Sequence, residues 1–188
     1  MTEHLEEGGI TVGVDVRDLV AQIREDARAH GQRTRPGFHA IAVHRLGVWG
    51  EQQSRPVRTL TRLVHKVVNT LVIRNLYGIE MYRSTVIGRR VILPHHYGVV
   101  LGRWAVIGDD CIIRQHVTLG KATDLGPDRE QPRLEDRVEV GAGATIMGGI
   151  TVGAGAKIGP NAVVLRDVPA GATAFAPLTK IMRPAEST

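Results

Sequence analysis

The chain has 188 residues and a single cysteine, so it is long enough for one compact domain but cannot form an intrachain disulfide. Its net charge of +5 is spread along the sequence and not massed in one block, which gives little reason to expect nucleic-acid binding. It shows no signal-peptide pattern and no run of about 18 uninterrupted apolar residues, so we expect a cytoplasmic protein without a membrane span.

The first 79 residues predict an N-terminal helical segment. Residues 1–14 are rich in Glu and Gly, and we expect them to be poorly ordered. Apolar residues at helical spacing then predict three helices, over 15–30, 36–50 and 56–78. Asp15 is the candidate N-cap of the first helix, prolines open the other two, and Gly78 ends the third.

A different pattern begins near residue 80, where an aliphatic residue recurs every six positions and is usually followed by Gly, Ala or an acid. The aliphatic positions are Ile87, Leu93, Val99, Leu101, Ile107, Ile113, Leu119, Leu134, Val140, Ile146, Val152, Ile158 and Val164. This period predicts a parallel β-helix, because three six-residue sides form one triangular coil with the aliphatic side chains stacked inside. We expect it to span 80–178, with a tail at 179–188, and we expect the glycines to form its corners.

Two interruptions of the repeat indicate where a site lies. One is a two-residue offset around 95–100, and the other is the segment 121–133, which has two prolines, several charges and no repeat. A solenoid accommodates such excursions on one face, often its binding face. We therefore expect 121–133 to be a mobile loop that projects from the coil near the active site.

These features resemble the bacterial serine acetyltransferases, a family of hexapeptide-repeat acyltransferases. The resemblance rests on PGFHAIAVHRL at 36–46, IGRR at 87–90, the stretch 95–102 and VTLG at 117–120, and it extends from about residue 23 to 169. It implies a mainly β fold, a left-handed parallel β-helix behind an N-terminal helical segment. It also implies acetyl-CoA as co-substrate and a homotrimer, with acetyl-CoA between adjacent β-helices.

The resemblance further implies roles for single residues. In the family, the histidine that matches His95 is the catalytic base, and an acid at the position of Glu80 orients it. The residues that match the border of the coenzyme A channel are Gly120, Lys121, Ala142 and Lys157. We expect the small residues among them to let the pantetheine arm approach the backbone, and the lysine at 157 to meet a phosphate.

The departures from the family fall on its amino-acid pocket. Pro94 stands directly before the histidine, where the family carries Asp, and Glu130 and Gln131 occupy the places of an Arg-His pair that helps to hold serine. The acidic segment before the second helix is reduced to 30–35, and Glu80 replaces an Asp. In these respects the pattern is closer to the exopolysaccharide acetyltransferases of the colanic-acid type.

The residue types themselves suit base-catalysed acyl transfer. An alcohol needs a base that takes its proton as it attacks a thioester, and a carboxylate on the far imidazole nitrogen fixes the tautomer. Glu80 and His95 would form such a dyad, with His96 as the next candidate for the base. A lone histidine beside a coil is, however, more often a surface or pairing residue, and an acid such as Glu80 can simply be solvated.

The remaining candidates have weaker support. His116 could line a groove between subunits, so we place it with His96, Glu130 and Gln131 near the acceptor. We expect His39 and His44 to be structural, and Cys111 to pack in the coil and not to carry the acyl group. No His/Cys cluster has metal-ligand spacing, so we expect no metal.

Three functions remain open. The first is an O-acetyltransferase whose acceptor is a sugar, a glycan or a secondary metabolite, and the losses in the amino-acid pocket favour it. The second is a serine O-acetyltransferase of cysteine biosynthesis whose pocket uses other residues. The third is a non-catalytic trimeric scaffold, which the presence of His95 and Glu80 argues against.

Overall fold

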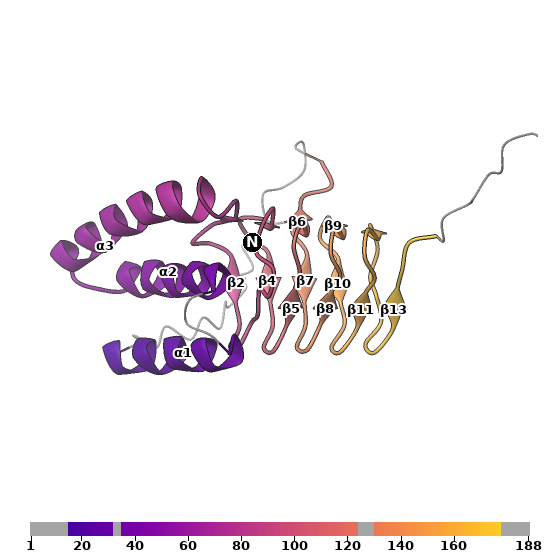
Figure 1. The fold of residues 1–188 in the computed structure, drawn as a ribbon, viewed down its shortest axis with the longest axis horizontal. Coiled ribbons are helices and arrows are strands. Elements are labelled where there is room, and N and C mark those ends of the chain that lie inside the picture. The colour runs from indigo at the N-terminus through magenta and orange to yellow at the C-terminus, as the bar shows by residue number, and fades with distance from the viewer. Residues whose placement is uncertain (1–14, 32–34, 124–129, 178–188) are drawn as a thin grey trace, which may run out of the picture.

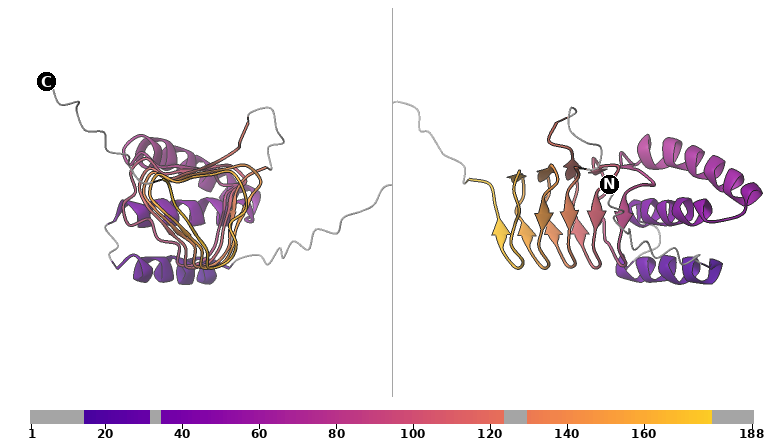
Figure 2. Two further views of the ribbon diagram at one scale, coloured as in Figure 1. Left: turned by 90° about the vertical axis from the view of Figure 1, so that its right-hand side faces the viewer. Right: turned by 180° about the vertical axis from the view of Figure 1, so that it is seen from behind.

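The computed structural model describes residues 15–31, 35–123 and 130–177, which form a bundle of three helices joined to one end of a triangular β-helix (Figure 1). The helices extend from the first coil roughly along the axis of the β-helix, with α2 between α1 and α3 (Figures 1 and 2). The predicted tail at 179–188 and the segment 1–14 lie outside the described residues.

The helices are α1 (Val16–Ala29), α2 (Pro36–Glu51) and α3 (Arg55–Val68), and α3 continues as a six-residue π-helical segment, η1 (Asn69–Arg74). The first two agree with the predicted helices to within two residues. Asp15 occupies the N-cap position of α1, but its side chain makes no capping hydrogen bond. The third predicted helix ends earlier than expected, because the α-helical pattern changes at Asn69 and the helical turns stop before Gly78.

The apolar side of α3 faces away from the rest of the chain. Leu60, Leu63 and Leu71 are 63%, 60% and 60% exposed, and Val64 and Val67 are also exposed. The opposite side meets α2, where His65 is buried against Gly47. The helical spacing therefore correctly predicted an amphipathic helix, but the described part of the chain leaves its apolar face exposed.

The β-helix has three faces, each a parallel sheet of two- or three-residue strands, and the end-on view shows their triangular outline (Figure 2). The first face contains β1 (Glu80–Met81), β3 (Val100–Leu101), β6 (Thr118–Gly120), β9 (Thr145–Met147) and β12 (Val163–Val164). The second face contains β2 (Val86–Ile87), β4 (Val106–Ile107), β7 (Arg133–Leu134) and β10 (Thr151–Val152). The third face contains β5 (Ile112–Ile113), β8 (Glu139–Val140), β11 (Lys157–Ile158) and β13 (Thr173–Ala174).

The predicted aliphatic repeat forms the core of this left-handed β-helix. All thirteen repeat positions are buried, and none is more than 7% exposed. A second inward row lies two residues before most of the repeat positions and is filled mainly by small or aliphatic side chains, and Cys111 is one of them at 0% exposure. Burial raises the pKa of the Cys111 thiol to about 11, so it is an inert core residue, as predicted.

The glycines act differently from what the sequence suggested. The glycines that follow the repeat positions, such as Gly108, do not have a left-handed backbone; a Cβ there would lie 2.7 Å from the backbone nitrogen of Asp136 in the next coil. They are needed because adjacent coils approach closely. The left-handed corner positions come two residues later and are occupied by Arg90, Asp110 and Arg137 as well as by glycines.

The two interruptions of the repeat change the coil that contains them. Glu80 pairs with Val100, so the first coil takes 20 residues, whereas the coil from Val100 to Thr118 takes 18. The two extra residues enter after Ile92, which still pairs with Ile112, and so widen the corner that contains His95. The second interruption runs from β6 to β7 and ends one residue earlier than predicted, because Arg133 already pairs in the second face.

A network of buried polar groups joins the helices to the first coil. Arg45 of α2 forms an ion pair with Asp26 of α1, at 3.1 Å, and donates hydrogen bonds to the carbonyl oxygens of Ile87 (2.6 Å) and Gly88. His44, on the neighbouring position of α2, donates through Nε2 to the Thr85 carbonyl at 3.0 Å. These bonds satisfy backbone groups at the open end of the β-helix and fix its first coil relative to the helices.

Candidate active site

His95 lies at the widened corner between the third and first faces. The backbone on both sides of it is anchored: the Leu93 N–H donates to Nε2 of the buried His30 at 3.2 Å, and the Gly98 N–H donates to the Gly78 carbonyl at 3.0 Å. The His95 side chain itself is exposed. The corner therefore presents an accessible imidazole on a fixed backbone, which is what a general base requires.

Glu80 lies on β1, which pairs with β3, the strand that follows this corner. Its N–H donates to the Val99 carbonyl at 2.8 Å, which places it beside the end of the His95 corner. Its carboxylate accepts a hydrogen bond from the hydroxyl of Tyr82, the residue that directly follows β1. Within the described residues no hydrogen bond joins Glu80 to His95, so the dyad stays a prediction.

Tyr82 and Arg103 extend the site along the edge of the first face. The guanidinium carbon of Arg103 lies 4.7 Å from the centre of the Tyr82 ring, in a cation–π contact. The hydrogen bond to Glu80 is the main reason why the pKa of Tyr82 is raised, so the tyrosine remains a proton donor to this carboxylate at neutral pH. The ring thus holds the candidate acid in place.

The His96 side chain packs against other residues of the chain, whereas that of His95 is exposed. Its ring meets Tyr77 edge-on, with 5.6 Å between ring centres, and Tyr77 in turn stacks on His39 of α2. Burial and the nearby His95 lower the pKa of His96, so it is neutral at pH 7. His39 bonds the Tyr77 hydroxyl through Nδ1 at 3.1 Å, in keeping with the structural role expected for it.

His116 occupies the same corner one coil further on. Its backbone is left-handed (φ 58°), its N–H donates to the Tyr97 carbonyl at 2.9 Å, and its ring packs edge-on against Tyr97. Gly98 has no room for a Cβ because the His116 ring lies over it. The structure therefore brings His116 beside the His95 corner, which is compatible with the predicted role near the acceptor.

The side chains of the neighbouring loop residues Glu130 and Gln131 have different environments. Glu130 is exposed, whereas the Gln131 side chain packs over Gly102 and its buried Oε1 accepts no hydrogen bond within the described residues. A buried amide oxygen without a donor is unfavourable, so this atom is available to a donor from a ligand. Residues 124–129, on which the prediction of a mobile loop rests, lie outside the described residues.

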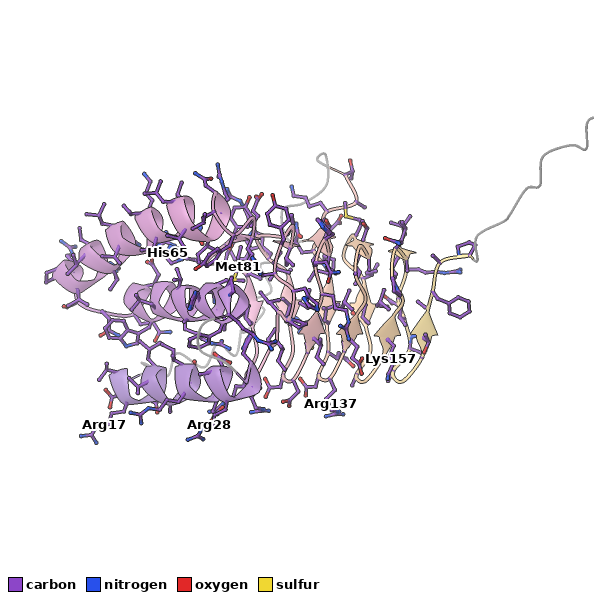
Figure 3. All side chains as sticks on the ribbon, viewed as in Figure 1. Arg17, Arg28, His65, Met81, Arg137 and Lys157 are labelled. Carbon is purple, nitrogen blue, oxygen red and sulfur yellow. The ribbon has the colours of Figure 1, made fainter. Side chains whose placement is uncertain are left out.

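The predicted coenzyme A residues lie on different parts of the described β-helix. Gly120 and Lys121 lie at the end of β6, and Ala142 lies at the opposite edge of the first face, in the turn before β9. Lys157 points outward from the third face and pairs with Glu139 at 3.3 Å (Figure 3). A channel that uses all four would have to be completed by another surface, such as a second β-helix.

Two further findings concern possible cofactors and location. Across 15–31, 35–123 and 130–177, no three His, Cys, Asp or Glu side chains come together as metal ligands, and the expectation of a metal-free reaction stays a prediction. No helix in this part of the chain is long and apolar enough to cross a membrane.

The sequence did not identify Tyr82, Arg103 or Gln115 as site residues. The alternation of a β-strand could have identified Tyr82, because residues two apart lie on the same face. The buried Gln115 Oε1, also without a hydrogen-bond donor in the described structure, lies at the His116 corner. Nothing in the sequence pattern predicts the contact of Arg103 with Tyr82, which depends on how successive coils stack.

Comparison with known proteins places these residues in a wider context. Residues 132–166 match the profile of the family described as bacterial transferase hexapeptide (six repeats). A serine acetyltransferase of Helicobacter pylori is 40% identical over 139 residues, which cover 74% of this chain and 77% of that protein. The serine acetyltransferase of Mycobacterium tuberculosis is 42% identical over 137 residues, or 73% of this chain and 56% of that protein.

The solved structures agree with the sequence relatives. Soybean serine acetyltransferase complexed with serine superimposes with a TM-score of 0.72 and 34% identity, covering 86% of this chain and 68% of that one. The chain spans about half the length of several curated relatives, for example 53% of the serine acetyltransferase of Synechococcus elongatus.

Proposed function

Because the chain belongs to the serine acetyltransferase family of hexapeptide-repeat transferases, we propose that it moves an acetyl group from acetyl-CoA to an acceptor hydroxyl. His95 is the general base, and Glu80, held by Tyr82, is the acid that steadies it. The observation that carries the proposal is the exposed His95 on an anchored backbone at the one widened corner of the first coil. The base would take the hydroxyl proton as the oxygen attacks the thioester carbonyl, and would return it to the coenzyme A thiolate.

L-Serine is the first candidate for the acceptor. The relatives from H. pylori and M. tuberculosis are named for serine acetyltransferase, and the soybean structure holds serine. These likenesses reverse the preference of the sequence analysis, which placed a sugar, glycan or secondary metabolite first.

A larger, uncharged polyhydroxylated acceptor is the second candidate, and two observations favour it. Pro94 offers no carboxylate beside the base, and Gln131 packs an uncharged amide over Gly102 where a family member would place a cation. A carboxylate and an ammonium group both need charged partners when they leave water, whereas sugar hydroxyls do not. Losing a charged partner is unfavourable by about 1.5–3 kcal/mol, so two losses would weaken serine use by orders of magnitude.

Steady-state kinetics with acetyl-CoA, followed through release of the free thiol, separates the candidates. L-Serine should be compared with a panel of sugars and glycosides, each with the wild type and with His95→Ala. Serine turnover that His95→Ala abolishes supports the first candidate, and turnover of a sugar alone supports the second. If no acceptor accelerates thiol release, the scaffold hypothesis gains and acetyl transfer is rejected.

We also propose a homotrimer with acetyl-CoA between neighbouring β-helices. The exposed apolar side of α3 and η1, with Leu60, Leu63 and Leu71, is a surface that a contact between subunits would cover. The separation of Ala142 and Lys157 from Lys121 in one chain supports a channel shared by two chains. Sedimentation that finds only monomer at micromolar concentration would reject the trimer.

A further inference from the structure

A cavity of about 280 Å³ lies beside the candidate site, between α3–η1 and the turn that follows β1. Tyr82 forms part of its wall, and the same tyrosine donates a hydrogen bond to Glu80, so the cavity and the candidate acid share a side chain. Figure 3 labels His65 on α3 and Met81 at the start of the first coil, the two elements that enclose this space.

The wall of this cavity is strongly basic. Arg62, Lys66 and Arg83 line it, and the acid that pairs with them is Glu51, which binds Arg62 at 2.6 Å and also binds Arg83. Lys66 has no ion-pair partner among the described residues. Three cations against one carboxylate leave an excess of two positive charges, and each guanidinium has more N–H donors than Glu51 can accept.

Neutral hydrogen-bond donors complete the wall. Asn69 and Thr70 of η1 line the cavity together with Tyr82 and the buried His65. Burial, followed by the nearby Arg83, lowers the pKa of His65, so this ring is neutral at pH 7 and can donate one hydrogen bond. The cavity is thus lined both by positive charge and by residues that carry neutral hydrogen-bond donors.

We infer that this cavity binds a phosphoryl group. A phosphate monoester carries a charge of about −1.5 to −2 at pH 7 and several acceptor oxygens, which matches an excess of two positive charges with surrounding donors. The volume lies at the lower end of the range for ligand pockets, about 300–1,000 Å³, so it suits one group of a larger molecule. The ammonium group of free serine would be repelled here.

The position of the cavity favours the acceptor as the source of this group. It borders the first coil beside Glu80, whereas Ala142 and Lys157, predicted for coenzyme A, lie in later coils. From Gly78, next to the His95 corner, to Tyr82 is four residues, or at most about 13 Å of extended chain. An acceptor with its hydroxyl at His95 and its phosphoryl group in the cavity would therefore have to bridge no more than about that distance. This part of the inference rests on the proposed acetyl transfer.

The first test is calorimetric titration of the full chain with inorganic phosphate. Lys66→Gln removes one unpaired cation from the wall, and Arg28→Gln is the matched control, since Figure 3 shows Arg28 on α1, on the other side of α2 from α3. We expect Lys66→Gln to weaken phosphate binding about tenfold or more and Arg28→Gln to leave it unchanged. Melting curves followed by circular dichroism serve as the control that both variants fold. Absent phosphate binding, or equal binding by the two variants, overturns the inference.

The second test identifies the source of the phosphoryl group. The donor arm compares binding of coenzyme A and 3′-dephospho-coenzyme A, and the acceptor arm compares KM for a hexose and its phosphate ester, each in wild type and Lys66→Gln. A preference for the ester that Lys66→Gln abolishes assigns the cavity to the acceptor, and a loss of the donor preference assigns it to coenzyme A. If phosphate binds but neither ratio changes, the cavity holds an adventitious ion only and the inference is wrong. The titrations need no turnover, so a failure of acetyl transfer is recognised separately.

Discussion

The later coils, from β7 to β13, and the junction between the helices and the first coil are built in opposite ways. The later coils bury aliphatic residues and alanines. The six polar or charged residues that are buried as whole residues in the described part of the chain belong to the junction: Asp26, His30, His44, Arg45, His65 and Thr85. His44 Nδ1 and Trp49 Nε1 are buried and have no hydrogen-bond partner among the described residues, and both residues line one small cavity at the junction, of about 80 Å³.

The difference follows from what each region has to satisfy. A middle coil has a similar coil on each side. Its backbone groups therefore form hydrogen bonds with the neighbouring coils, and its interior needs only apolar side chains of the right volume. The first coil has a coil on one side and helices on the other, and its free backbone groups are bonded by side chains such as Arg45 and His44. The irregular end therefore carries both the polar network and the candidate chemistry.

The largest expected effect comes from His95→Ala. A general base is worth about 10²–10⁴-fold in rate, so kcat should fall by that factor. Because the side chain is exposed, the melting temperature should stay within a degree or two. The matched control is His96→Ala, the neighbouring histidine that packs on Tyr77. If His96→Ala lowers kcat more than His95→Ala does, the base has been assigned to the wrong residue.

Asp26→Ala sharpens the comparison on stability. It leaves the buried Arg45 without its partner, and breaking a buried pair lowers the free energy of unfolding by about 3–5 kcal/mol. Ile146→Val, in the regular coils, should lower it by only about 0.5–1.5 kcal/mol. Urea titration of both variants measures the two values. Equal losses would show that the junction is no more sensitive than the repeat.

The pH dependence of stability gives a third effect, of about 3 kcal/mol. Burial, followed by Arg45, lowers the pKa of His44 to about 4, whereas in the unfolded chain it is about 6.5. Between pH 4 and pH 6.5 the folded state therefore binds fewer protons than the unfolded state. The stability that the neutral His44 contributes is complete above pH 6.5 and is lost as the pH falls toward 4. His30 and His65, whose pKa values burial also lowers, act in the same direction.

Unfolding titrations at a series of pH values check this expectation, with His44→Gln as the variant. The variant should show a shallower loss between pH 6.5 and 4, since His30 and His65 still titrate. The segment 133–174 contains no histidine, so hydrogen exchange at low pH should rise first at the junction. A slope that is identical in wild type and variant would contradict the assignment to His44.

Much of the site could be located from the sequence, but not its contacts. The two-residue offset in the repeat marked the His95 corner, and the structure confirms that the first coil is longer there. The sequence could not show that the Glu80 carboxylate meets Tyr82, or that Gln131 buries its amide over Gly102. Such contacts depend on rotamers and on the stacking of coils that are 20 or more residues apart.

The β-helix was determined by the sequence alone, because the same six-residue pattern of aliphatic and small residues recurs in every coil and each coil contacts only its neighbours. Tertiary structure decided the rest. It turned the apolar side of α3 outward, paired Asp26 with Arg45, and brought Lys66 of α3 to the same cavity as Arg83 after β1. These arrangements depend on how a helix bundle docks on the end of a solenoid, and that orientation is set by packing between distant segments, which no local pattern records.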